Sequence, residues 1–317
     1  MDLELKIENF GPIDKATIRV GQFTVFAGPN NTGKTFVAKM LYSFLNARNA
    51  NHTLVFFDVI TRDIESGLQL LGQSGREEEE LPLSAIRKGL QKIDTILREA
   101  FPSHPIQNEL DKLRTVQSEL MAEIEKIKVY SQTLKRNIKT KEEGTSAFLS
   151  ETYDRIESSI GTLENCFRNV ELAIRWGGRF KFRQNVRGNF QSSNLSNLKG
   201  EGDSPLYFRV GGVGEFRVTE HTLELDTYTQ IFQNKQLFPE AFYLESPLYW
   251  KLKSALESIK LDSRSPSGAS LNGVPDYFYD MAVALRRRRI EHPFGRLHKR
   301  LHDAIGGQIS LSEAGDL

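Results

Sequence analysis

The chain has 317 residues, of which 39% are apolar and 26% are charged, so it can form a packed core and is not disordered as a whole. The formal net charge is +1, from 42 basic and 41 acidic residues, so the global charge neither favours nor excludes nucleic acid. The single cysteine, Cys166, excludes an internal disulfide and a cysteine-rich metal site.

The start of the chain carries no targeting signal that we recognise. Residues 1–6 lack the basic-then-apolar order of a signal peptide. No apolar run in the sequence approaches the roughly 20 residues that cross a bilayer. We therefore expect a cytoplasmic protein with no membrane partner.

The first 45 residues carry dense structural signals. Residues 3–8 alternate apolar and polar side chains, and residues 16–20 alternate again after the turn signal Gly11-Pro12. This pattern predicts a β-hairpin. Residues 23–27 are nearly all apolar and predict a third strand that is buried on both faces. Residues 36–45 have the apolar spacing of a helix.

A phosphate-binding loop lies between that strand and that helix. Residues 28–35 read GPNNTGKT and satisfy the pattern G-x-x-x-x-G-K-[ST] in full. In this motif backbone N–H groups cradle the phosphates, the lysine reaches the β- and γ-phosphates, and the final hydroxyl binds Mg²⁺. The predicted ATP-binding residues are Gly28, Pro29, Asn30, Asn31, Thr32, Gly33, Lys34 and Thr35, and Thr35 is also the predicted Mg²⁺ ligand.

Residues 46–105 are less distinctive. The run at residues 54–58, LVFFD, is compatible with a strand or with part of a helix. The four glutamates at residues 77–80 predict a solvated loop rather than a metal site.

Residues 106–175 carry a heptad signal in two blocks separated by the polar stretch 139–146. In each block, apolar residues spaced by seven form one row, and a second row of residues spaced by seven runs beside it, offset by three or four positions. The rows are Leu113, Leu120, Ile127 and Leu134 in the first block, and Leu149, Ile156, Leu163 and Val170 in the second. We predict an antiparallel coiled-coil arm, each helix about 40 Å long at about 1.5 Å per residue. The alternative is a pair of long helices within a bundle.

The remainder of the chain returns to strand signals. Residues 176–178, Trp-Gly-Gly, predict the end of the second helix. Short alternating stretches at 206–210 and 215–218 predict small strands. Further strands are predicted at 242–245 and 308–311, and helices at 248–260 and 276–304. The predicted fold is α/β with a mixed sheet, divided into an N-terminal lobe (1–105), a coiled-coil arm (106–175) and the rest of the head (176–317).

The order of the opening motifs resembles a known family. Residues 7–13 read IENFGPI, and a strand that ends at Val20, the apolar stretch 23–27 and the phosphate loop follow them. This order is similar to that of the RecF/SMC/OLD group of ABC-type ATPases. The resemblance is closest to prokaryotic AAA-family ATP-binding proteins akin to OLD nuclease heads, many of them found with anti-phage systems. It covers most of the chain, but its specific part is the N-terminal one.

This resemblance implies roles for particular residues. It implies that Asn9 and Phe10 lie near the adenine, with hairpin packing as the alternative for Phe10. It implies that Gln191 is a Q-loop glutamine that contacts Mg²⁺ or water, with an ordinary surface residue as the alternative. Asn31 stands where the family most often has glycine, and asparagine is the side chain that best tolerates a positive φ.

Three expected elements of such a head are not found in the sequence: a signature helix, a strand that ends in Asp-Glu, and a switch histidine. Residues 54–58 come too early for the acidic strand, residues 242–245 lack the acidic pair, and residues 305–308 precede a strand-like stretch rather than a helix. We therefore expect the N-terminal half of a head, a fragment or one completed by a second polypeptide. Whether this chain hydrolyses ATP alone stays open.

The functional hypothesis is an ATP-binding ABC-type head, DNA-associated or linked to anti-phage defence, working as a homodimer or with another ATPase partner. The alternative is a non-catalytic interaction or DNA-tethering module in which ATP is a structural ligand. The basic residues between 286 and 302 fit a phosphate contact, but also a solvated helix face. Cys166 has no visible activating neighbour, which predicts an unreactive thiol.

Overall fold

The computed structural model describes residues 3–21, 24, 26–27, 29, 31–73, 77–102, 108–139, 147–192, 195–200, 204–211, 214–218 and 223–224. These residues form two compact units, divided after residue 49 and again after residue 181. We call residues 3–49 and 182–224 the sheet unit, and residues 50–181 the helical unit. The elements predicted after residue 224 and the basic residues 286–302 lie outside the described residues.

The sheet unit contains a five-stranded sheet in the order β2-β1-β3-β4-β5. The strands are β1 (Leu3–Phe10), β2 (Ile13–Val20), β3 (Leu206–Val210), β4 (Gly214–Val218) and β5 (Leu223–Glu224). The predicted hairpin and the two predicted strands near residue 210 are confirmed. All four ladders among these strands are antiparallel, so the predicted mixed sheet is not what this part of the chain forms.

The predicted third strand, residues 23–27, lies partly outside the described residues. Its described members, Thr24, Phe26 and Ala27, have no strand pairing. The first helix is confirmed as α1 (Lys34–Asn49).

One face of the sheet is apolar because alternate residues of neighbouring strands fall in register. Ile7 on β1 pairs with Phe208 on β3, and Phe208 pairs with Phe216 on β4. All three side chains are buried. Phe182, in the second half of α6 (Val170–Phe190), places its ring 4.8 Å from that of Phe216 and 5.7 Å from that of Phe44 on α1. The core of the sheet unit therefore joins the sheet to α1 and the last turns of α6.

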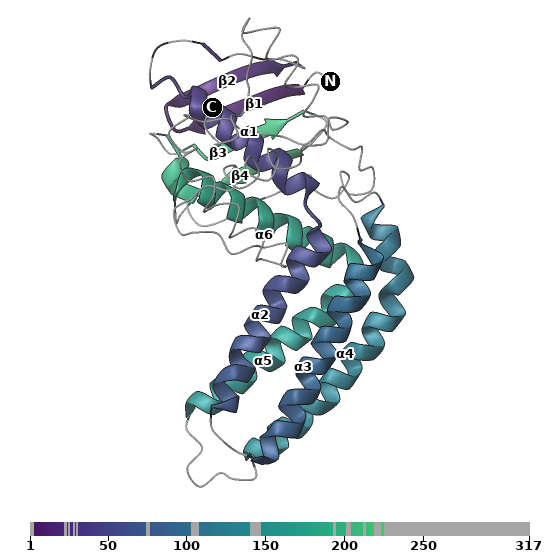
Figure 1. The fold of residues 1–317 in the computed structure, drawn as a ribbon. Coiled ribbons are helices and arrows are strands. Elements are labelled where there is room, and N and C mark those ends of the chain that lie inside the picture. Colours follow the sequence, from purple (N-terminus) through teal and green to yellow (C-terminus); the bar gives the residue numbers. More distant parts are fainter. Residues whose placement is uncertain are drawn as a thin grey trace, which may run out of the picture. The chain divides into compact units, whose positions relative to one another are not determined.

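The helical unit contains four long antiparallel helices (Figure 1). They are α2 (His52–Gly72), α3 (Glu77–Ala100), α4 (Glu109–Lys139) and α5 (Ala147–Arg168). The first predicted heptad row, on α4, is fully buried throughout. The four glutamates at 77–80 begin α3 instead of forming a loop.

The predicted projecting coiled coil is wrong, because α4 and α5 also pack against α2 and α3. A Cβ placed on Gly89 of α3 would lie 2.6 Å from Ile127 of α4, and one on Gly67 of α2 would lie 2.6 Å from Ile156 of α5. Ser159 of α5 donates to Asp63 of α2 at 2.6 Å. The heptad rows therefore belong to a four-helix bundle, the alternative that the sequence left open.

Beside the row Leu113–Leu134, a second row of residues spaced by seven on α4 includes two polar residues, Gln117 and Ser131, and both have partners within the bundle. Gln117 Nε2 donates to the last carbonyl oxygens of α5, those of Phe167 and Arg168, at 2.9 Å each. The hydroxyls of Ser131 on α4 and Tyr153 on α5 lie 3.1 Å apart. These contacts cap α5 and align it with α4.

Gly177 does not end a helix, contrary to the prediction, because α6 continues through it to Phe190. A Cβ at this position would overlap the carbonyl oxygen of His52 and lie 2.7 Å from its carbonyl carbon. The glycine is therefore required by a close approach between α6 and the start of α2. Beside it, Trp176 stacks on Phe180 at 5.5 Å and meets the ring of Phe56 edge-on at 5.4 Å.

Candidate functional site

The phosphate loop turns into α1 through two residues in the left-handed backbone region. Asn31 has φ +63° and Gly33 has φ +81°. The first helical hydrogen bond runs from Val37 N to Gly33 O at 3.0 Å, so Gly33 is the residue that caps the helix. The positive φ of Asn31 confirms that asparagine replaces glycine here at little steric cost. Gly28 and Asn30 lie outside the described residues.

The first turn of α1 has the features of an anion site. It contains no acidic side chain, and its leading N–H groups lack helical partners by geometry. The side chain of Thr35 is exposed. Lys34 Nζ donates to the carbonyl oxygen of Pro29 and to Thr32 Oγ1 at 3.2 Å, so the ammonium lies over the loop rather than away from it. The loop thus gathers a cation, N–H donors and a hydroxyl.

The β1–β2 turn supports this loop through two glycine contacts. A Cβ on Gly33 would lie 2.5 Å from Ile13 Cγ1, and a Cβ on Gly11 would lie 2.5 Å from the ring of Phe36. Gly11 also has φ +54°. The turn and the start of α1 therefore interlock. In the sequence, Gly11 is recognisable only as a turn signal, and no local pattern marks Ile13 as a contact of Gly33.

A cluster of phenylalanine rings lies under the interlocked turn. The ring of Phe10 is 5.3 Å from Phe36, 5.8 Å from Phe190 and 6.2 Å from Phe208. Phe10 is 0% exposed. Its burial among three rings favours hairpin packing over stacking on a base.

Asn9, the other residue assigned to the adenine side, closes the turn through its own polar atoms. Its backbone has φ +50°, its Nδ2 donates to the carbonyl oxygen of Ser204, and its carbonyl oxygen accepts from Gly200 N at 3.1 Å. Asn9 is buried. Its contacts therefore hold the hairpin to the segment that leads into β3.

Gln191 directly follows the last residue of α6, Phe190, which packs against the start of α1. The ring of Phe190 lies 5.4 Å from that of Phe36, the residue after Thr35. Gln191 N donates to Gly188 O at 3.3 Å and Ser192 N to Arg187 O at 3.1 Å, the pattern of a Schellman cap. Gln191 has φ +51° and is exposed. Glycine is the usual residue at such a position, so the glutamine side chain is kept at a cost of about 1 kcal/mol.

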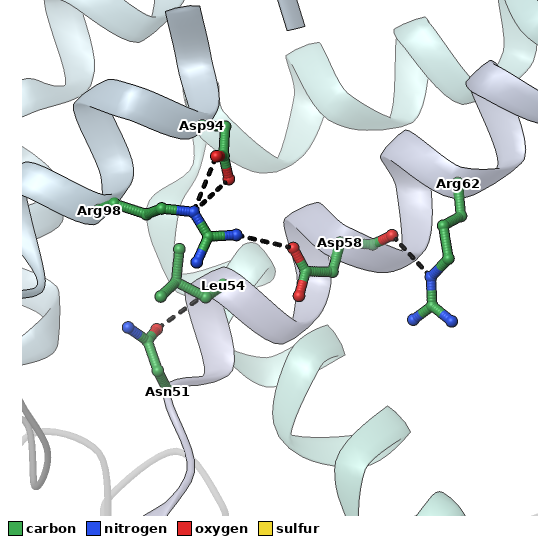
Figure 2. A network of polar contacts seen from close by, with 6 residues as sticks. All are labelled: Asn51, Leu54, Asp58, Arg62, Asp94 and Arg98. Carbon is green, nitrogen blue, oxygen red and sulfur yellow. Dashed lines mark hydrogen bonds and ion pairs between the residues drawn. The ribbon is translucent and has the colours of Figure 1, made fainter. Parts of the chain in front are cut away.

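The run at residues 54–58 is not an acidic strand beside the phosphate loop, because it lies within α2 (Figure 2). The side chain of Asn51 accepts from Leu54 N at 2.9 Å and caps the helix. Arg98 Nε donates to the carboxylate of Asp94 at 2.7 Å, and its other end lies 3.9 Å from Asp58 (Figure 2). Hydrogen bonding to Asp94 raises the pKa of Arg98. Asp58 therefore links α2 to α3.

Among the described residues, one further candidate from the sequence is Cys166. Cys166 is buried, and burial raises the pKa of its thiol to about 11, which confirms an unreactive cysteine. No cluster of three metal-ligating side chains is present in the described part of the chain. Within those same residues, no helix has the length and apolar character to cross a membrane.

Comparison with families of known proteins gives one match. Residues 1–197 match the family model described as AAA ATPase domain. The matched residues include the phosphate loop, the helical unit and the Gln191 cap. A search of curated proteins and a search of solved structures give no match.

Proposed function

The chain belongs to the AAA ATPase domain family, and from this premise we propose that residues 28–35 bind Mg·ATP, with Thr35 and Gln191 on the Mg²⁺ side. Family membership carries the general function, an ATP-binding ATPase. The assignment of individual residues is our proposal. The observation that carries it is the loop geometry, in which Asn31 and Gly33 adopt positive φ immediately before a helix with no acidic first turn.

Lys34 supports the proposal because its ammonium already lies over the loop. The Pro29 carbonyl and Thr32 Oγ1, which accept hydrogen bonds from it there, are neutral oxygens. A phosphate oxygen carries charge and makes a stronger, charge-assisted hydrogen bond. We therefore expect the ammonium to exchange these acceptors for the β- and γ-phosphates.

Gln191 also supports the proposal, because its backbone has a positive φ, which is unfavourable for glutamine and would be relaxed for glycine. A side chain kept at a positive φ, one residue after a ring that packs on the start of α1, is best explained by a contact that the side chain makes. Glutamine offers an amide oxygen, which suits Mg²⁺ or a water bound to it. Since Mg²⁺ in such sites takes few protein ligands and several phosphate or water oxygens, Thr35 and Gln191 suffice.

We further propose that the chain is a head of the RecF/SMC/OLD type, which works as a dimer or with a partner ATPase. The supporting features are the hairpin that interlocks with the phosphate loop and the helical unit inserted between α1 and the Gln191 cap. The sequence contains no Asp-Glu pair. We therefore expect the chain alone to bind Mg·ATP and to turn it over slowly.

Calorimetric titration with Mg·ATP tests the binding site. Lys34→Ala is expected to weaken binding about 10- to 100-fold, because a hydrogen bond to a charged group contributes about 1.5–3 kcal/mol. Lys15→Ala, which removes an equal charge from an exposed site on β2, is the matched control and keeps wild-type affinity. Undiminished binding by Lys34→Ala would refute the assignment of the loop.

Gln191→Gly tests the second residue and separates function from stability. Glycine relaxes the positive φ, so the variant should be more stable than wild type by about 0.5–1 kcal/mol. It should also lose affinity for Mg·ATP, but not for ADP without Mg²⁺. A variant that gains stability and keeps its Mg·ATP affinity would show that the side chain has no role in the site.

A further inference from the structure

A set of buried side-chain hydrogen bonds joins α1 to the last turns of α6. Ser43 on α1 and both Asn185 and Asn189 on α6 are 0% exposed. Asn189 Nδ2 donates to Ser43 Oγ at 2.7 Å, and Ser43 Oγ donates to the carbonyl of Lys39 at 2.7 Å. One turn earlier, Asn185 Nδ2 donates to the carbonyl of Ser43 at 3.1 Å and to Asn46 Oδ1 at 3.0 Å. We call Ser43, Asn185 and Asn189 the polar seam.

Most of the buried side chains on the same stretches of α1 and α6 are apolar, among them Val37, Met40, Phe44, Phe182 and Val186. Arg48 on α1 is a buried charged side chain nearby in the sequence. The acceptors on Ser43 fix the orientation of both amides. The Ser43 carbonyl can only accept, so it faces the Nδ2 of Asn185. The Ser43 hydroxyl already donates its hydrogen to Lys39, so it accepts from the Nδ2 of Asn189. The seam therefore has one hydrogen-bonded arrangement.

Stability alone does not account for the two asparagines. The Oδ1 atoms of Asn185 and Asn189 are buried and have no hydrogen-bond partner among the described residues. An unsatisfied buried acceptor is unfavourable, and well-packed apolar side chains at such positions are often as stable or more stable. The best-attested use of polar groups in an apolar helix interface is to fix register.

The register of this interface sets the place of Gln191. Asn189 precedes Gln191 by two residues, and Phe190 between them packs against Phe36 at the start of α1. A slip of α6 by one helical turn along α1 would move the cap by about 5.4 Å. Such a shift exceeds the tolerance of any direct contact with a phosphate or metal.

We propose that the polar seam positions Gln191 against the phosphate loop, with Asn185 and Asn189 as positioning residues that do not touch the nucleotide. This inference rests on the proposed role of Gln191. The positioning role of the polar seam could not be predicted from the sequence. Its only signal there is a pair of asparagines four residues apart, and so on one face of a helix.

A double-mutant cycle tests the functional part in the full chain. Asn189→Leu is expected to weaken Mg·ATP binding about 10-fold and to change ADP binding without Mg²⁺ by less than about 2-fold. Combined with Gln191→Gly, it should give no further loss, because both changes remove the same contact. Additive losses, or equal losses for ATP and ADP, would overturn the proposal. Thermal unfolding of the variant shows whether it is folded.

Gln184→Leu is the matched control. This residue lies on the same part of α6, exchanges an amide for the same apolar side chain, and has no hydrogen bond to α1 in the described structure. Its Mg·ATP and ADP affinities should equal those of wild type. A 10-fold loss of Mg·ATP affinity in this variant would mean that any change in α6 disturbs the site, and would overturn a specific role of the seam.

The claim that the polar seam fixes the position of Gln191 is tested without nucleotide. The result therefore holds even if the proposed function is wrong. Spin labels are placed at Asp14→Cys on β2 and Gln191→Cys, in a Cys166→Ser background, and the distribution of distances between them is read by pulsed EPR. Replacing Asn185 and Asn189 by leucine should broaden the single distance of the wild type into several. An unchanged distribution would refute the positioning role. If wild type does not bind Mg·ATP, or Lys34→Ala binds it equally well, the proposed function is what has failed.

Discussion

At the scale of single residues, the phosphate loop depends on the absence of a side chain at Gly33. Gly33→Ala would place a methyl group 2.5 Å from Ile13 Cγ1 at a backbone φ of +81°. Both the contact and the positive φ oppose the substitution. We expect the variant to lose more than about 10-fold in Mg·ATP affinity, measured by calorimetry. Gly188→Ala in α6 has no atom within 4 Å of its new Cβ and should bind as wild type does; an equal loss there would contradict the steric argument.

Cys166 gives a pH-dependent prediction at the same scale. Burial raises the pKa of its thiol from 9.0 to about 11. Because the folded pKa lies above the unfolded one, the stabilising contribution is complete below pH 9 and is lost as pH rises toward 11. A thiol reagent at pH 8 should react far more slowly with the folded protein than with protein in urea. Equal rates in both states would show that the thiol is accessible.

At the scale of elements, Gly177 marks where α6 meets α2. Gly177→Ala would overlap the carbonyl group of His52, which belongs to backbone and has little room to move. Overpacking of this kind costs about 1–3 kcal/mol, and we expect the upper end of that range. Gly161→Ala on α5, exposed and with nothing within 4 Å, should instead stabilise by about 0.5–1 kcal/mol. Urea unfolding measures both, and similar changes in the two variants would contradict the close-approach argument.

The same elements show what a sequence pattern can and cannot predict. The hairpin, the phosphate loop and α1 follow from local signals, namely strand alternation, turn residues and a motif. The heptad rows on α4 and α5 predict buried stripes, but a stripe does not say how many helices cover it, so α2 and α3 were missed as partners. Gly177 was misread because a glycine that ends a helix and one that admits another backbone look alike in sequence. The polar seam depends on contacts between residues about 140 positions apart.

At the scale of the whole molecule, the candidate site lies entirely within the sheet unit. A ligand that binds only the folded state stabilises it by about 2.7 kcal/mol at 100 times its Kd. We therefore expect Mg·ATP to slow hydrogen exchange in residues 31–49 and 182–192 more than in α3 and α4. Lys34→Ala should abolish the difference. Protection confined to the bundle helices would place the nucleotide elsewhere.

The aromatic stack at Trp176 has a practical consequence. The chain contains two tryptophans, Trp176 and Trp250. With Trp250→Phe, all tryptophan emission would come from an indole that lies between Phe180 of its own helix and Phe56 of α2. Its emission wavelength would then report when α2 and α6 separate, and so would provide an optical signal for unfolding of the bundle that needs no added label.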